Sequence, residues 1–125
     1  MPFLIIGCVL LVLCGLYLLS VRGRRKHPDL PKLQNWAYAH RGLYNETRPE
    51  NSMAAFRAAL DGGYGIELDV HLLADGNLAI MHDSSLRRTA GAEIRMEDLT
   101  TEQLGNYHLG GTEETIPSFE QVLQL

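Results

Sequence analysis

The apolar and polar positions divide the chain into one long apolar run and a mixed remainder. The run extends from Pro2 to Val21 and carries no charged side chain. A helix of roughly 20 residues, at 1.5 Å per residue, spans the ~30 Å hydrocarbon core of a bilayer. We therefore expect residues 1–21 to form a single-pass membrane anchor. A cleaved signal peptide is the competing interpretation, disfavoured because no basic region precedes the run.

Basic residues and prolines follow the apolar run. The basic residues are Arg22, Arg24, Arg25 and Lys26. Positive charge beside a membrane span favours the cytoplasmic side, so we expect the globular part to be cytoplasmic. The same charges could simply end the helix at the headgroup level or hold anionic lipid. Pro28 and Pro31 prevent the helix from continuing, so residues 22–35 are expected to be a linker.

Two apolar segments predict strands on either side of a helix. The segment from Trp36 to Ala39 breaks at a His-Arg-Gly sequence and is expected to be a buried strand ending in a loop. Apolar positions from Met53 to Leu60 predict a helix, with Asn51 or Ser52 as its N-cap. A second strand is expected from Gly65 to His71, after a pair of glycines that ends the helix.

The second strand has one acidic face. Alternation with period two places Glu67, Asp69 and His71 on the same face. Two unpaired carboxylates are costly to bury, so this face is either solvated or binds a positive group. Carboxylate oxygens suit Mg²⁺ or Ca²⁺, although a lone carboxylate pair is more often a solvated strand face. We assign no metal-binding role to His71.

The remaining pattern predicts a hairpin and short helices. Asp75-Gly76 is a typical hairpin turn and leads into a third strand, Leu78 to Met81. The segment from Leu86 to Gly91 is expected to be a polar loop. Two capping boxes, Thr100 with Gln103 and Ser118 with Gln121, each predict the start of a short helix.

Two histidines and an arginine follow the predicted strands. His40 and His82 each come directly after an apolar strand, and histidine is suited to proton transfer near pH 7. Arg41 could hold phosphate oxygens in bidentate fashion. Each residue alone is more often structural or solvated. Their occurrence beside an acidic pair favours metal-assisted cleavage of a phosphate ester.

Charge and cysteine usage exclude some classes of protein. The net charge of −4 argues against a nucleic-acid binder, which would carry a basic stripe. The two cysteines, Cys8 and Cys14, both lie in the apolar run and are too few for a disulfide framework or a metal site.

Several short motifs follow one another in the globular part. They are His40-Arg41-Gly42, Pro49-Glu50-Asn51-Ser52, Glu67-x-Asp69-Val70, Asp75-Gly76 and His82-Asp83-x-x-Leu86-x-Arg88-Thr89. In order and spacing they resemble the glycerophosphodiester phosphodiesterase family. The resemblance covers nearly all of residues 36–125, and its motifs are specific as a set although each is weak alone.

The resemblance implies an α/β fold, the N-terminal part of a (β/α)₈ TIM barrel, with its site at the carboxyl ends of the strands. A complete barrel needs about 250 residues, so residues 36–125 are expected to be an incomplete domain, inactive alone, whose third acidic ligand lies elsewhere. The roles it implies are His40 and His82 as the acid and base, Arg41 on the phosphate, Glu67 and Asp69 on a divalent cation (Ca²⁺ or Mg²⁺), and Glu50 at the edge of the metal site.

The expected function is metal-dependent hydrolysis of glycerophosphodiesters to an alcohol and sn-glycerol 3-phosphate, in lipid metabolism. One alternative is a lysophospholipase D-like lipid phosphodiesterase. The other is a non-catalytic, membrane-anchored binding module. The expected partners are accordingly a glycerophosphodiester or lysophospholipid substrate and a membrane, with no nucleic acid.

Overall fold

The computed structural model describes residues 2–23 and 27–125. The predicted basic cluster falls partly outside this description, because Arg24, Arg25 and Lys26 are not among the described residues. The chain forms two compact units, Met1–Asn35 and Trp36–Leu125.

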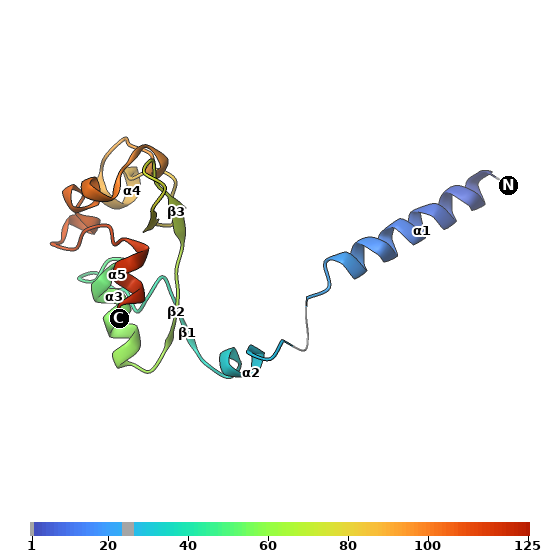
Figure 1. The fold of residues 1–125 in the computed structure, drawn as a ribbon, viewed down its shortest axis with the longest axis horizontal. Coiled ribbons are helices and arrows are strands. Elements are labelled where there is room, and N and C mark those ends of the chain that lie inside the picture. The colour runs from blue at the N-terminus through green and yellow to red at the C-terminus, as the bar shows by residue number, and fades with distance from the viewer. Residues whose placement is uncertain (1, 24–26) are drawn as a thin grey trace. The chain divides into compact units, whose positions relative to one another are not determined.

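The first unit contains two helices, α1 (Pro2–Ser20) and α2 (Leu30–Leu33) (Figure 1). At 1.5 Å per residue, the 19 residues of α1 extend about 28 Å, slightly less than the ~30 Å hydrocarbon core. Across residues 2–23 and 27–125, the structure contains no helix with both the length and the apolar character that crossing a membrane requires. The predicted transmembrane anchor at residues 1–21 is therefore not supported.

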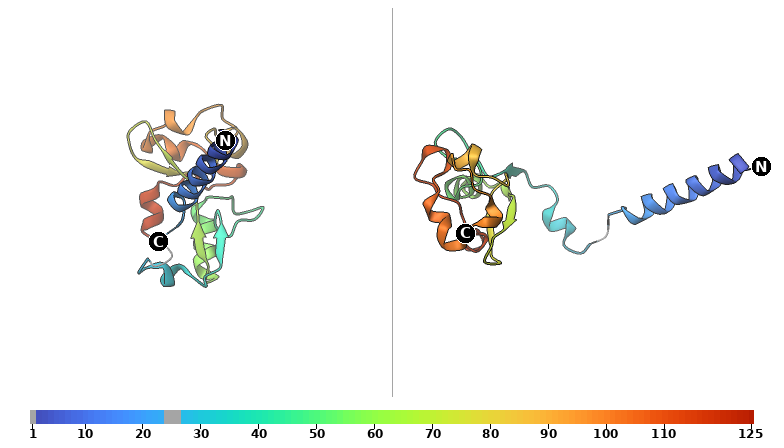
Figure 2. Two further views of the ribbon diagram at one scale, coloured as in Figure 1. Left: turned by 90° about the vertical axis from the view of Figure 1, so that its right-hand side faces the viewer. Right: turned by 90° about the horizontal axis from the view of Figure 1, so that it is seen from above.

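The second unit begins with a strand–helix–strand arrangement. β1 (Tyr38–His40) pairs in parallel with β2 (Gly65–Glu67), and α3 (Met53–Asp61) connects them (Figure 2). The register places His40 directly opposite Glu67. This arrangement is the repeating unit of a (β/α)₈ barrel, in which functional side chains follow the strands.

Helix α3 forms where the sequence predicts it. Of the two expected caps, Ser52 is the one used, because its side chain accepts a hydrogen bond from the Ala55 N–H at 3.2 Å. The buried residues Ala55, Phe56 and Ala59 lie on one face, at helical spacing. The helix ends at Asp61, with Gly62 as its C-cap. The cap and the apolar face are local features, which explains why the pattern identifies this helix correctly.

The first strand differs from its prediction. It was expected from Trp36 to Ala39 as a buried strand, but it spans Tyr38–His40 and only Ala39 is buried. Trp36 and Tyr38 are exposed. Among the described strands, β1 pairs with β2 along one of its edges. A central strand of a parallel sheet is instead paired along both edges and buried on both faces.

The predicted second strand, Gly65 to His71, is two strands rather than one. β3 (Val70–Leu72) is separated from β2 by Leu68 and Asp69, and it pairs antiparallel with β4 (Leu78–Ile80) in a separate sheet. The Met81 N–H donates to the Asp69 carbonyl at 3.1 Å, which ties the break to the end of β4. The chain changes partners at this break, so the alternation of faces does not continue across it. The predicted hairpin from β3 to β4 is confirmed.

A compact core lies under the second half of this unit. Leu86 is fully buried within it, and the following residues form α4 (Arg87–Ala90), which ends at Gly91 with a φ of 69°. The expectation of a polar loop here was wrong, because the buried leucine attaches this segment to the core. The buried cluster comprises Leu73, Ala79, Met81, Leu86, Met96, Leu99, Leu104, Leu109 and Ile116.

Short helical segments complete the unit, and both predicted capping boxes are present. Ser118 and Gln121 cap α5 (Phe119–Leu123) reciprocally, at 2.9 and 3.2 Å. Thr100 and Gln103 form the other box. The single-turn or 3₁₀ segments are η1 (Met96–Asp98), η2 (Thr101–Asn106) and η3 (Leu109–Gly111).

Candidate active site

The candidate side chains lie in and after the strands β1, β2 and β4. His40 ends β1 and Glu67 ends β2, and the parallel register brings them together, with His40 Nε2 4.0 Å from Glu67 Oε2. The backbone N–H of Arg41 donates to the same Glu67 oxygen at 3.2 Å. The carboxylate of Glu67 is therefore oriented by the loop that follows β1.

Arg41 is held in an unusual backbone conformation with its side chain mostly enclosed. Its φ is 58°, in the left-handed region that non-glycine residues rarely adopt. The side chain is 17% exposed, and Nη1 donates to Glu50 Oε1 at 3.1 Å. Nε is buried without a hydrogen-bond partner, 3.6 Å from Asp69 Oδ2. The enclosed guanidinium is thus positioned between two carboxylates.

Asn51 joins the loop after β1 to the break between β2 and β3. It is 1% exposed and has a φ of 55°. Its N–H donates to the Arg41 carbonyl at 2.9 Å, and its Nδ2 donates to Asp69 Oδ2 at 3.1 Å. Sequence reasoning treated Asn51 only as a possible helix cap. Its actual role is to orient Asp69, a contact between segments that no local pattern contains.

His82 is oriented by its neighbour in the sequence. Its Nδ1 lies 2.7 Å from Asp83 Oδ1, while Arg88 Nε donates to Asp83 Oδ2 at 2.7 Å. The Arg88 guanidinium, followed by His82, lowers the pKa of Asp83 to about 2. Asp83 is then a carboxylate at neutral pH and can only accept hydrogen bonds. The proton in this contact belongs to His82 Nδ1, which leaves Nε2 for chemistry.

Glu50 lies between two arginines. Its Oε1 accepts hydrogen bonds from both Arg41 and Arg88, and these contacts, that with Arg88 above all, lower its pKa. The resemblance placed Glu50 at the edge of a metal site. In the structure its Oε1 already carries two positive partners, which would repel a cation. Glu50 is thus a partner of both arginines, and its place at the edge of a metal site stays a prediction.

The carboxylates of Glu67 and Asp69 fit a divalent cation in their chemistry. Both offer hard oxygen donors, and the contacts to Arg41 and Asn51 involve only Oε2 of Glu67 and Oδ2 of Asp69. The structure does not gather a full ligand set, since the described residues contain no group of three or more His, Cys, Asp or Glu side chains placed to hold a metal ion. Water and substrate oxygens would have to complete the coordination.

His71 does not join the acidic pair. Its Nε2 lies 3.2 Å from the His82 carbonyl, an oxygen that can only accept, so it supports the loop after β4. Besides Asn51, the residues whose contacts the sequence pattern did not predict are Arg88 and Asp83. Asp83 directly follows a candidate histidine, which was a usable signal. Arg88 was hidden by the expectation of a polar loop.

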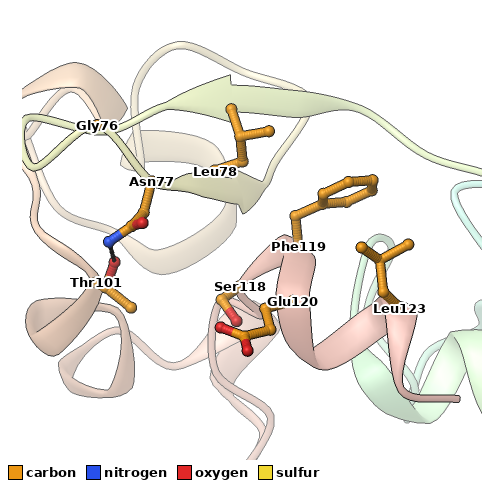
Figure 3. Close-up of a pocket in the computed structure, with 8 residues that line it drawn as sticks. All are labelled: Gly76, Asn77, Leu78, Thr101, Ser118, Phe119, Glu120 and Leu123. Carbon is orange, nitrogen blue, oxygen red and sulfur yellow. Dashed lines mark hydrogen bonds between the residues drawn. The ribbon is translucent and has the colours of Figure 1, made fainter.

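Two of the hollows on the second unit differ in their relation to the candidate site. One is lined by residues of the β3–β4 turn, β4 and α5, among them Leu78 and Phe119 (Figure 3). None of the candidate site residues lines it. The other lies beside the histidine site, because Asp83 and Arg88 line it together with polar neighbours.

The strand–helix–strand unit, with charged side chains at the strand ends, defines an α/β protein of the barrel type. Residues 40–125 match the Glycerophosphoryl diester phosphodiesterase family, and the chain belongs to this family. The family expected from the motifs is thereby confirmed.

Individual relatives agree with this assignment. A glycerophosphodiester phosphodiesterase of Bacillus altitudinis is 45% identical over 95 residues, which cover 70% of this chain and 38% of the relative. The crystal structure of glycerophosphodiester phosphodiesterase from Thermotoga maritima matches with a TM-score of 0.60 and 32% identity, over 70% of this chain and 37% of that one.

An Oleispira antarctica phosphodiesterase, solved in complex with the product sn-glycerol-3-phosphate, matches with a TM-score of 0.66 and 28% identity, over 75% of this chain and 40% of that one. The chain thus spans well under half the length of these relatives. The part that it spans fits a portion of their TIM barrel.

Proposed function

We propose that this chain supplies the histidine and arginine residues of a phosphodiesterase that converts glycerophosphodiesters to an alcohol and sn-glycerol 3-phosphate. The observation that carries the proposal is the His82–Asp83 pair, whose contact at 2.7 Å leaves Nε2 of the histidine available. The family supports the substrate class, since relatives carry this activity in their names and one was solved with sn-glycerol-3-phosphate.

The side chains suggest a division of roles. Arg41, enclosed between Glu50 and Asp69, would bind phosphate oxygens as a charge-assisted donor. His40 and His82 would transfer protons, one removing a proton from the attacking oxygen and the other donating one to the departing alcohol as the P–O bond breaks. Both imidazoles are accessible, with side-chain exposures of 67% and 43%.

A divalent cation, Ca²⁺ or Mg²⁺, is part of this proposal. Glu67 and Asp69 would hold it through their carboxylate oxygens. When bound, it would supply positive charge against the phosphate. The role of the protein is to orient both carboxylates, which the Arg41 N–H and the Asn51 amide do.

The test is hydrolysis of glycerophosphocholine by the protein as the cell makes it, with and without chelator. We expect activity that chelator removes and a Ca²⁺ or Mg²⁺ salt restores. His40→Ala and His82→Ala should each lower kcat by about 10²- to 10⁴-fold, the usual range for a lost general acid or base. His27→Ala is the matched control, because His27 is exposed, its ring lies near Asp29, and it stands outside residues 36–125. A His82→Ala variant with full activity would contradict the assignment.

The same assay separates the alternatives. Hydrolysis of lysophosphatidylcholine in preference to glycerophosphocholine would indicate a lysophospholipase D-like enzyme. Binding of sn-glycerol 3-phosphate without any hydrolysis would indicate a binding module. The cellular location stays a prediction.

A further inference from the structure

Arg88 connects the two halves of the candidate site. Its Nε donates to Asp83 after β4, and its Nη2 donates to Glu50 in the loop after β1. Two donors of one planar guanidinium thus bind two carboxylates that come from different parts of the chain. Lysine has no such fork and could not reproduce both contacts with the same geometry.

We propose that Arg88 is a positioning residue, which fixes the ring of His82 through Asp83 and the guanidinium of Arg41 through Glu50. This inference rests on the proposed function. Arg88 is not a catalytic residue in it, because the groups that would touch the substrate are His82 and Arg41.

Arg88 is connected to His82 through both carboxylate oxygens of Asp83. Oδ1 faces His82 Nδ1 at 2.7 Å and Oδ2 accepts from Arg88 Nε at 2.7 Å. With both oxygens engaged, the carboxylate plane cannot rotate freely. Without Arg88 the carboxylate loses its second partner, and the imidazole loses a fixed acceptor for its Nδ1 proton. The other tautomer, with the proton on Nε2, then becomes accessible.

Arg88 is connected to Arg41 through one carboxylate oxygen of Glu50. Oε1 accepts from Arg88 and also from Arg41 Nη1 at 3.1 Å. Arg88 therefore restrains the carboxylate that orients the buried guanidinium of Arg41. A single residue on α4 influences both the proposed proton-transfer group and the proposed phosphate-binding group.

The backbone of Arg88 is well anchored. Leu86, which precedes α4, is fully buried, and the Ala90 N–H donates to its carbonyl at 2.8 Å. Thr89 Oγ1 contacts Met81 Sδ at 3.4 Å. Among the described residues, the side chain of Arg87 on the same helix pairs with Glu93 at 3.0 Å and is 78% exposed. Arg87 lines the same hollow as Asp83 and Arg88, but within the described part of the chain it makes no ion pair with Asp83 or Glu50. It is therefore a matched control for positive charge on this helix.

The test compares Arg88→Gln, Arg88→Lys and Arg87→Gln in the protein as the cell makes it. The first readout is the tautomer of His82, followed through the ¹⁵N chemical shifts of its ring. The second is the kinetics of glycerophosphocholine hydrolysis. Wild-type protein should show His82 protonated on Nδ1, and Arg88→Gln should show a mixture of tautomers.

In the kinetics, Arg88→Gln should lower kcat by about 10- to 100-fold, the usual effect of removing a group that orients a functional side chain. KM should also rise, since Arg41 loses its restraint, and Arg88→Lys should recover part of kcat. Arg87→Gln should match wild type in both readouts. Arg88→Gln with the wild-type His82 spectrum would overturn the positioning role, whatever the activity. Wild-type protein with the expected spectrum but no hydrolysis would instead overturn the proposed function alone.

Discussion

The amide of Asn51 donates a hydrogen bond to Oδ2 of Asp69 at 3.1 Å, between a fully buried loop residue and a carboxylate at the break between two strands. Asn51 adopts a φ of 55° to make this contact, and its N–H also holds the carbonyl of Arg41. This residue therefore sets the relative positions of the phosphate-binding candidate and one cation-binding candidate.

Substitution of Asn51 should separate its side-chain contact from its backbone conformation. Asn51→Ala loses a hydrogen bond to a charged acceptor, worth about 1.5–3 kcal/mol, and adds strain at the left-handed φ. Asn51→Gly loses the bond without that strain. We expect both variants to be less stable in urea unfolding of the full chain, and the alanine variant by about 1 kcal/mol more. Equal stability of the glycine variant and wild type would show that the bond to Asp69 contributes nothing.

Gly42 should not tolerate a side chain. Its φ is 81°, and an added Cβ would lie 2.9 Å from both the backbone carbon and Cβ of Ala55. Gly76 is the matched control, because its φ is 83° and nothing lies within 4 Å of the same position. Gly76→Ala should cost about 1–2 kcal/mol from backbone strain, and Gly42→Ala about 1–3 kcal/mol more from the clash. Equal losses in urea unfolding would mean that the β1 loop yields to the added methyl group.

The ion pair of Asp83 with Arg88 should lose its contribution to folding stability at low pH. The folded pKa of Asp83, about 2, lies below its ordinary value of 3.8, so the unfolded chain takes up a proton first as the pH falls. The stability from this pair is therefore present above about pH 4 and lost between about pH 4 and pH 2.

Replacing Arg88 should shift the loss of the stability that Asp83 contributes to a higher pH. Carboxyl ¹³C shifts measured during an acid titration of Arg88→Gln should show the pKa of Asp83 rising toward its ordinary value. Asp75 is an internal control: its pKa is also about 2, because the backbone N–H of Thr101 lowers it, and Arg88 does not touch it. An unchanged titration of Asp83 would show that Arg88 is not its main partner.

Cation binding should depend on Glu67 and Asp69 and not on Glu50. Isothermal titration with Ca²⁺ or Mg²⁺ should show weaker affinity for Glu67→Gln and Asp69→Asn, by about tenfold or more, because each change removes a charged ligand. Glu50→Gln should bind nearly as wild type, since Glu50 is engaged by two arginines. Glu120→Gln, an exposed change on α5, controls for the loss of one negative charge. A large loss confined to Glu50→Gln would restore Glu50 as a ligand.

The positions of several site residues could be predicted because these residues adjoin short apolar segments that the sequence pattern identifies as strands. His40 and His82 follow short apolar segments, and the structure places them at or just after strand ends as expected. Glu67 was expected inside a single strand from Gly65 to His71, but in the structure it ends β2. The predicted roles of these residues remain predictions. The hydrogen bonds and ion pairs that link these residues were not predicted, because contacts such as that of Arg88 with Glu50 join segments far apart in the sequence.

The sequence by itself determined the family, through the order and spacing of its motifs. It also determined helix α3, the hairpin at Asp75-Gly76 and both capping boxes, because these depend on interactions within a few residues, which a linear pattern contains. The tertiary structure decided that the chain changes sheets between Glu67 and Val70, that Leu86 attaches a helix to the core, and which carboxylate each arginine binds. Burial and charge pairing between distant segments outweighed local pattern at those points, because they depend on which surfaces the fold brings together.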